Sequence, residues 1–152
     1  SSTGRKDEAI AQFRMALAID PDVGEPHIGL AFALIDRGSL PGAIRELREV
    51  VRLRPKSPIA RNDLGVTLMR NGQLDSAIIE YKKALRLDPN LALALNNLGY
   101  AYTKSGDFRQ AIAVLKAALR LKPDYAGARA NLAEAYRAAG MPDSAALVQG
   151  DR

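Results

Sequence analysis

Apolar residues recur along the chain at helical spacing, in pairs of short runs separated by a turn signal. In the segment 64–85 one run contains Leu64 and Leu68, a second contains Ala77 and Tyr81, and Asn71-Gly72 stands between them. Residues three and four positions apart lie on one face of an α-helix, so each run predicts an amphipathic helix. Glycine tolerates the left-handed backbone that often ends a helix. The segment therefore predicts two helices joined by a tight turn.

This pattern repeats with a period of 34 residues. Four columns keep the interval: Pro21, Pro55, Pro89 and Pro123; Gly4, Gly38, Gly72, Gly106 and Gly140; Ala9, Ala43, Ala77, Ala111 and Ala145; Leu30, Leu64, Leu98 and Leu132. Proline disfavours helical geometry in the residue before it, so the proline column predicts the end of each second helix. The candidate N-caps of the next helices are Asp22, Ser57, Asn90 and Asp124. Columns in phase over the whole chain predict a repeat protein.

Small and bulky residues alternate between the two helices of each unit. The small column on the first helices is Ala31, Gly65, Gly99 and Ala133, and the bulky column on the second helices is Phe13, Leu47, Tyr81 and Leu115. We expect the helices to approach closely at the small residues. A large side chain at Gly99 is then expected to cost at least the ~1–3 kcal/mol that is typical of overpacking.

The residues Leu98-Gly99-x2-Tyr102, Gly106, Ala111-x3-Leu115 and Pro123 resemble the tetratricopeptide repeat pattern, and the other units share it over nearly the whole chain. The resemblance implies an all-α fold, a right-handed α-solenoid of tetratricopeptide helical hairpins. The sequence departs from the family at the large aromatic residue near the start of the first helix. That column here reads His27, Arg61, Leu95 and Arg129.

The phase of the repeat also divides the chain. It predicts a single solenoid over 1–152, with a half repeat at 5–23, full repeats at 24–57, 58–91 and 92–125, and a final incomplete repeat at 126–152. The first half repeat is interpreted as a second helix whose first helix is missing, so we expect a piece of a longer protein. Ile10, Phe13 and Leu17 are expected where the missing helix would have covered them. We expect them to contact another copy or the rest of the longer protein.

The amino-acid composition limits the kinds of functional site that the chain can form. The chain of 152 residues is 47% apolar and 26% charged, which is ordinary for a globular domain, and it has no cysteine and one histidine. Disulfides, thiolate metal sites and cysteine nucleophiles are excluded, while the compartment, cytoplasmic or periplasmic, stays open. There is no His-Glu-x-x-His motif, so the sequence predicts no metal site, no cofactor and no enzyme. No apolar run approaches the ~20 residues of a membrane span.

The net charge of +5 raises the question of an acidic partner. Basic residues gather on the second helices, for example at Lys82, Lys83 and Arg86, but acidic residues such as Glu46 and Glu80 are interspersed. Interspersed signs favour a solvated surface over a track for phosphates. Nucleic acid is therefore not the partner we expect.

The resemblance implies that the first helices line a concave groove. Residues on those helices that the packing columns do not use are the candidate peptide contacts: Phe32, Ile35, Asn62, Asp63, Val66, Met69, Arg70, Asn96, Asn97, Tyr100, Lys104, Asn131, Glu134 and Arg137. Apolar members near Phe32 would supply buried anchors. Asn97 and Asn131, one repeat apart, could bracket the backbone of an extended peptide because amides both donate and accept hydrogen bonds.

The function that the sequence favours is a protein–protein interaction scaffold that holds a peptide or protein segment in this groove. Two alternatives stay open at this point. One is a region that recruits substrates for a larger, transferase-like enzyme, and the other is a scaffold that self-associates through its ends into a homo-oligomer.

Overall fold

The computed structural model describes residues 2–150, and side chains from residue 4 onward. These residues form nine α-helices and no strand. The helices are α1 (Ser2–Ile19), α2 (Gly24–Asp36), α3 (Leu40–Leu53), α4 (Pro58–Arg70), α5 (Leu74–Leu87), α6 (Ala92–Ser105), α7 (Phe108–Leu121), α8 (Ala126–Ala138) and α9 (Pro142–Gln149). The all-α helical-hairpin solenoid that the sequence predicts is confirmed.

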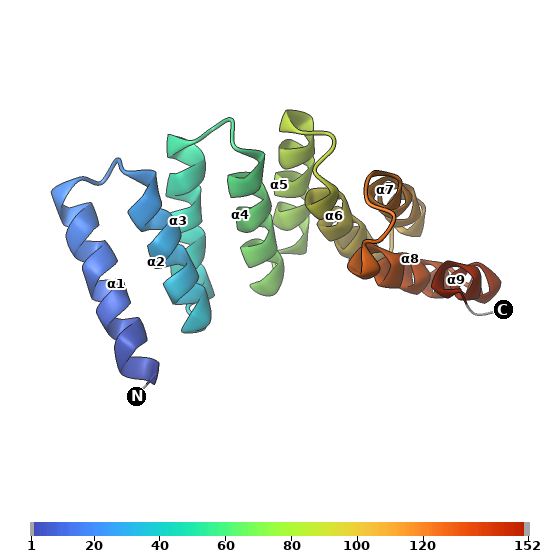
Figure 1. The fold of residues 1–152 in the computed structure, drawn as a ribbon, viewed down its shortest axis with the longest axis horizontal. Coiled ribbons are helices and arrows are strands. Elements are labelled where there is room, and N and C mark those ends of the chain that lie inside the picture. Colours follow the sequence, from blue (N-terminus) through green and yellow to red (C-terminus); the bar gives the residue numbers. More distant parts are fainter. Residues whose placement is uncertain (1, 151–152) are drawn as a thin grey trace.

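The helices stack in two layers, and Figure 1 shows the stack as an arch with α1 and α9 at opposite ends. Each helix packs against the next one along the chain. Even-numbered helices also pack on each other, α4 on α6 and α6 on α8. Within residues 2–150, no two odd-numbered helices make as close a contact. The even-numbered helices therefore form the inner, concave layer, and the odd-numbered helices form the outer layer.

A member of the glycine column makes the turn inside each described hairpin, at Gly38, Gly72, Gly106 and Gly140. The first member, Gly4, lies within α1 and does not end a helix as the sequence predicts. Gly106, which follows α6, has a φ of 83°, in the left-handed region that an L side chain rarely adopts. The N–H of Asp107 donates to the carbonyl of Tyr102 over 2.9 Å, and the N–H of Gly106 donates to that of Thr103 over 3.2 Å. These bonds satisfy carbonyl groups that the helix end would leave unpaired.

The turns between hairpins contain the proline column, as expected, but three of the four candidate N-caps are wrong. The N-cap residues are Val23, Ser57, Leu91 and Tyr125, and of these only Ser57 accepts a hydrogen bond with its side chain, from the N–H of Ala60. In two of the other three turns, the carboxylate of the residue before the proline accepts a backbone hydrogen bond within the turn. Asp20 accepts the N–H of Asp22 and Asp88 that of Asn90, each over 3.0 Å. Such Asx-type contacts stabilise the turn itself.

The hydrophobic core runs along the seam between the layers, where the small column meets the bulky one. A Cβ atom added to Gly99 would lie 2.3 Å from Cγ of Leu115, and one added to Gly65 would lie 2.6 Å from a ring carbon of Tyr81. Leu115 and Tyr81 are themselves fully buried. The close approach expected at Gly99 is therefore between the α6 backbone and one α7 side chain.

The column that departs from the family is occupied by ion pairs in two repeats. Nδ1 of His27 lies 2.6 Å from the Glu46 carboxylate. Nη1 of Arg61 lies 3.1 Å from the Glu80 carboxylate, which also binds Lys83. In the following repeat the column is apolar, since Leu95 is part of the core. Polar partners in α3 and α5 thus replace the missing aromatic contact.

The structure corrects the placement of Ile10, Phe13 and Leu17 on α1. Ile10 is only 3% exposed and packs with Leu30 and Leu34 of α2, and the other two are partly buried against the same cluster. The Phe13 ring lies against Gly29, which has no side chain to hold it away. These residues face the stack because α2 covers them, so they are not an open surface.

Candidate functional site

The concave layer carries a series of half-exposed large apolar side chains. They are Phe32 on α2, Ile59 on α4, Leu93 and Tyr100 on α6. Solvent-facing apolar residues on successive helices of one layer form a surface that binding could bury. Phe32 and Tyr100 are among the residues that the sequence predicts for the groove.

A cavity of about 280 Å³ opens between α2 and α4, and we call it the α2–α4 cavity. It is lined by Phe32, Ile35, Asp36, Asp63, Val66, Thr67 and Arg70. Five of these belong to the predicted groove, namely Phe32, Ile35, Asp63, Val66 and Arg70. Helical spacing places Phe32 beside Ile35 and Asp63 beside Val66, and the stacking of α4 next to α2 brings the two faces together.

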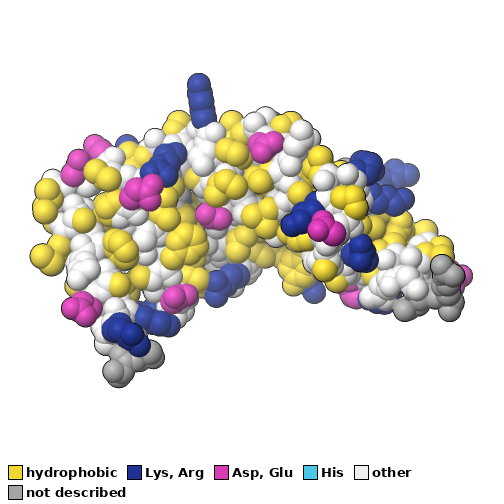
Figure 2. Space-filling model, viewed as in Figure 1, with side chains coloured by type: hydrophobic (Ala, Val, Ile, Leu, Met, Phe, Trp, Pro, Cys, Tyr) yellow, Lys and Arg dark blue, Asp and Glu magenta, His cyan; other side chains and the backbone are white. Residues whose placement is uncertain are grey.

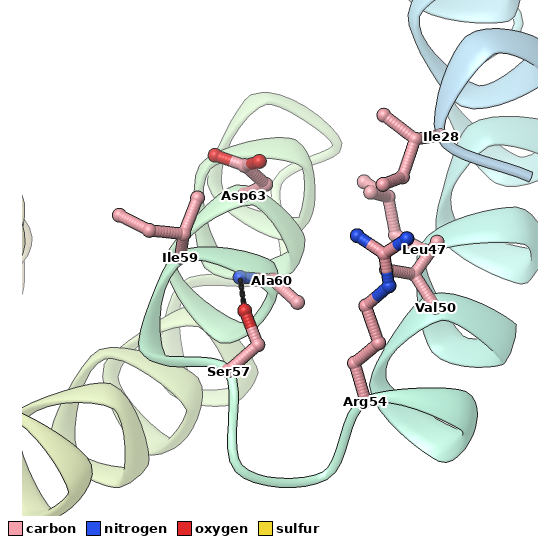
Figure 3. A pocket seen from close by; sticks show the side chains of 8 residues that line it. All are labelled: Ile28, Leu47, Val50, Arg54, Ser57, Ile59, Ala60 and Asp63. Carbon is pink, nitrogen blue, oxygen red and sulfur yellow. Dashed lines mark hydrogen bonds between the residues drawn. The ribbon is translucent and has the colours of Figure 1, made fainter. Parts of the chain in front are cut away.

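A second cavity of about 180 Å³ lies beside the first and shares Asp63 with it. Figure 3 shows its two walls, with Ile28, Leu47, Val50 and Arg54 on one side and Ile59, Ala60 and Asp63 on the other. Arg54 is held by Glu25 through an ion pair of 2.6 Å. Both cavities therefore lie at the junction between the α2–α3 hairpin and α4, and Asp63 stands between them.

The Asp63 carboxylate is partly buried at this junction. Burial disfavours its charged form and raises the pKa of Asp63 above the ordinary value, and a hydrogen bond with the Asn62 amide offsets part of that effect. Among residues 4–150 it forms no ion pair. The junction thus presents a carboxylate that has lost hydration without gaining a cation.

The asparagine residues form a ladder between neighbouring concave helices. The Asn97 side chain donates to Oδ1 of Asn62 over 2.9 Å, and the Asn131 side chain donates to Oδ1 of Asn96 over 2.8 Å. Asn62 is 1% exposed, so its prediction as a peptide contact is wrong; it is a structural residue. Asn97 and Asn131 are partly exposed and each keeps a side-chain oxygen and one N–H beyond these bonds.

The remaining predicted groove residues lie around or beyond the ladder. Met69 is partly buried against the core. Lys104 lies over the Tyr100 ring at 5.2 Å from its centroid, a cation–π distance. Arg137 pairs with Glu134 over 3.1 Å and also donates to Gln149. The structure therefore gathers the α2 and α4 residues around one cavity and distributes those of α6 and α8 over an open surface.

Sequence reasoning missed the residues that only the inter-repeat junction brings together. Ile59 and Leu93 stand 34 residues apart, on the first turn of successive inner helices, and this apolar pair in two adjacent repeats was the available signal. Arg54 carried no such signal, because it follows the end of α3 and reaches the second cavity only through the chain reversal before α4.

On the face that Figure 2 shows, charges of one sign do not form a continuous track. Figure 2 shows Lys and Arg side chains interspersed with Asp and Glu over the face in view. The described side chains contain no group of three His, Asp or Glu residues that could hold a metal ion. None of the helices within residues 2–150 is long and apolar enough to cross a membrane.

Comparison with sequence families matches most of the chain to repeats of one type. A model described as "TPR repeat" matches residues 31–72 and 67–106, and a model described as "Tetratricopeptide repeat" matches residues 102–148. Together these matches span residues 31–148. No curated protein sequence matches the chain.

Solved structures share the arrangement of the helices. A crystal structure of MamA is similar over 99% of this chain and 88% of its own, with 27% identity and a TM-score of 0.89. MamA 41-end from Desulfovibrio magneticus RS-1 covers 98% of this chain and 84% of its own, with 21% identity and a TM-score of 0.88. YrrB, described as a TPR protein with an unusual peptide-binding site, covers 100% and 82%, with 21% identity and a TM-score of 0.79.

Proposed function

Since the chain belongs to the tetratricopeptide repeat family, we propose that it is a protein-interaction scaffold that binds an extended peptide or protein segment along its concave layer. The observation that carries the proposal is the pair of adjoining cavities between the α2–α3 hairpin and α4, continued on α6 by exposed apolar side chains. The unusual peptide-binding site of YrrB, a protein with the same fold, supports the proposal.

The physical case rests on burial of apolar surface at a rigid site. Anchor residues of a peptide gain most where they fill pockets that already exist, because little ordering is required of the receptor. The walls of both cavities come from helices that are packed into the core, and one of them, α4, is also hydrogen-bonded to α6 by the Asn97–Asn62 pair. Further along the concave layer, Asn97 on α6 and Asn131 on α8 retain donors and acceptors for a peptide backbone.

The test is a selection from a random peptide display library on the immobilised chain, followed by titration of a labelled selected peptide. The groove variant is Phe32→Glu with Tyr100→Glu. The matched control is Ile79→Glu with Leu121→Glu on the outer helices, since these side chains are 52% and 44% exposed against 49% and 42% for the groove pair. We expect the groove variant to weaken binding at least tenfold and the control less than about twofold.

Circular dichroism must show that both variants stay helical. Equal loss of affinity in the two variants, or a library from which the chain enriches no peptide, would contradict groove binding.

A second candidate is self-association, which a different observation favours. Met15 and Ile19 lie four residues apart on one face of α1 and are 68% and 87% exposed, and Leu147 on α9 is 78% exposed. Pairing of these faces would bury them between two copies. Sedimentation equilibrium over a wide concentration range should then show a rising mass that Met15→Asp with Ile19→Asp abolishes; a constant monomer mass rules this candidate out.

A further inference from the structure

Side-chain hydrogen bonds join successive concave helices at two junctions, α4–α6 and α6–α8. Among the described side chains, no such bond joins α2 to α4. Asn97 bonds Asn62 between α4 and α6, and Asn131 bonds Asn96 between α6 and α8. One repeat earlier, the corresponding positions are Ile28 and Asp63. Isoleucine has no hydrogen-bonding group, so Asp63 finds no side-chain partner on α2. Both cavities of this region lie at that unbridged junction.

The α2–α4 cavity has a volume and a lining that suit one long side chain. Its volume of about 280 Å³ corresponds to roughly nine waters at ~30 Å³ each. The walls are apolar at Phe32, Ile35 and Val66, and Asp63 lies where the two cavities meet. An aliphatic stem would be buried against these walls while a polar head reached the carboxylate.

The charges around the cavity favour a cation. Its lining carries two carboxylates, Asp36 and Asp63, and one cation, Arg70, a net charge of −1. Neither carboxylate nor Arg70 is engaged in an ion pair with another described side chain. Burial removes water that stabilises the negative charge of a carboxylate, and a cation bound to the carboxylate restores that stabilisation.

We propose that the α2–α4 cavity binds a lysine or arginine side chain of an extended peptide, with the stem against Phe32 and the charged head on Asp63. This inference rests on the proposed function and names the chemistry of its partner. Asp36 at the same cavity adds to the attraction for the cation, and Arg70 disfavours a second basic residue beside it.

The experiment compares parallel selections from the random peptide library on the wild-type chain and on Asp63→Asn. Asparagine occupies the equivalent position in the next two repeats, at Asn97 and Asn131, so the variant is compatible with the fold. Asp124→Asn, an exposed carboxylate between α7 and α8, makes the same change of charge outside the groove and is the matched control.

The expected result is a lysine or arginine at one fixed position in the wild-type and Asp124→Asn selections, and no basic preference there for Asp63→Asn. A fluorescein-labelled selected peptide should lose about tenfold in affinity for the wild type when its lysine is replaced by norleucine or its arginine by citrulline. The same replacement should cost Asp63→Asn less than about twofold. The two peptide series also show which of the two cations the cavity prefers.

Two results separate failure of this inference from failure of the proposed function. Peptides that depend on Phe32 and Tyr100 but carry no fixed basic residue, or an acidic one facing Arg70, would overturn the inference and leave groove binding intact. A basic preference that persists in Asp63→Asn overturns it as well. If no peptide is enriched over the groove variant, the proposed function itself fails.

Discussion

The side-chain amide of Asn97 donates a hydrogen bond of 2.9 Å to Oδ1 of Asn62, which is 35 residues earlier and 1% exposed. The Asn131–Asn96 pair reproduces this contact one repeat later. The two pairs join α4 to α6 and α6 to α8. The amides that the sequence predicts for peptide binding are therefore first of all links between repeats.

We predict that Asn97→Ala lowers the free energy of unfolding by about 1–3 kcal/mol, because it leaves the buried Asn62 oxygen without a donor. Urea denaturation followed by circular dichroism measures this. Asn62→Ala combined with Asn97→Ala should cost less than the sum of the single changes, since both partners are then removed. Strict additivity would show that the contact contributes nothing.

Replacement of Gly99 tests the close approach of α6 and Leu115. Gly99→Ala places a Cβ 2.3 Å from Cγ of Leu115, and we expect a loss of roughly 1–3 kcal/mol from overpacking, with a larger loss for Gly99→Leu. The control is Gly4→Ala on α1, where an added Cβ meets nothing within 4 Å. There the higher helix propensity of alanine should leave stability unchanged or slightly raised. Thermal unfolding of the three variants measures these differences in stability.

The His27 ring makes stability depend on pH. Burial of the ring opposes its charge, but the Glu46 carboxylate and the Pro21 carbonyl outweigh burial and raise the pKa of His27 above its ordinary value of 6.5. Both partners are acceptors, at 2.6 and 2.9 Å, so only the protonated ring, in which both nitrogens donate, makes the two bonds at once.

Because the folded-state pKa is the higher one, the stabilisation is complete below pH 6.5 and is lost as pH rises through the raised pKa. The chain has one histidine, which isolates the effect. Urea unfolding from about pH 5.5 to about pH 9 should show the fall for the wild type and a flatter profile for His27→Gln. Identical slopes for the two proteins would contradict a stabilising His27–Glu46 pair.

The Arg61–Glu80 pair can be exchanged for the apolar residues of the next repeat, Leu95 and Val114. Arg61→Leu alone leaves the nearly buried Glu80 with Lys83 as its remaining cation, and we expect a loss of about 1–3 kcal/mol. Arg61→Leu with Glu80→Val should restore stability to within about 1 kcal/mol of the wild type or exceed it. Chemical denaturation gives the free energy of unfolding of both variants. A double variant that is less stable than Arg61→Leu would show that the ion pair at this column stabilises the fold.

Much of the fold follows from local rules that one sequence displays. The glycine before Asp107 requires a left-handed backbone, Pro123 cannot continue a helix, and Leu98 and Leu115 recur at a spacing that only a helix puts on one face. Because each hairpin contacts only its neighbours, these local features repeat in register and determine the whole stack. The repeat boundaries derived from the same phase stay a prediction.

The sequence by itself thus determined the helices, their order and the glycine-to-leucine packing between them. The tertiary structure decided which polar side chains are buried. Asn62 and Asn97 look alike in the sequence, but contact between α4 and α6 buries Asn62 and leaves Asn97 partly exposed. In the same way Asp63 stands beside cavities because the residue that faces it across the junction is Ile28 and not an amide. Such relationships depend on the distance between helices, which no pattern within one helix contains.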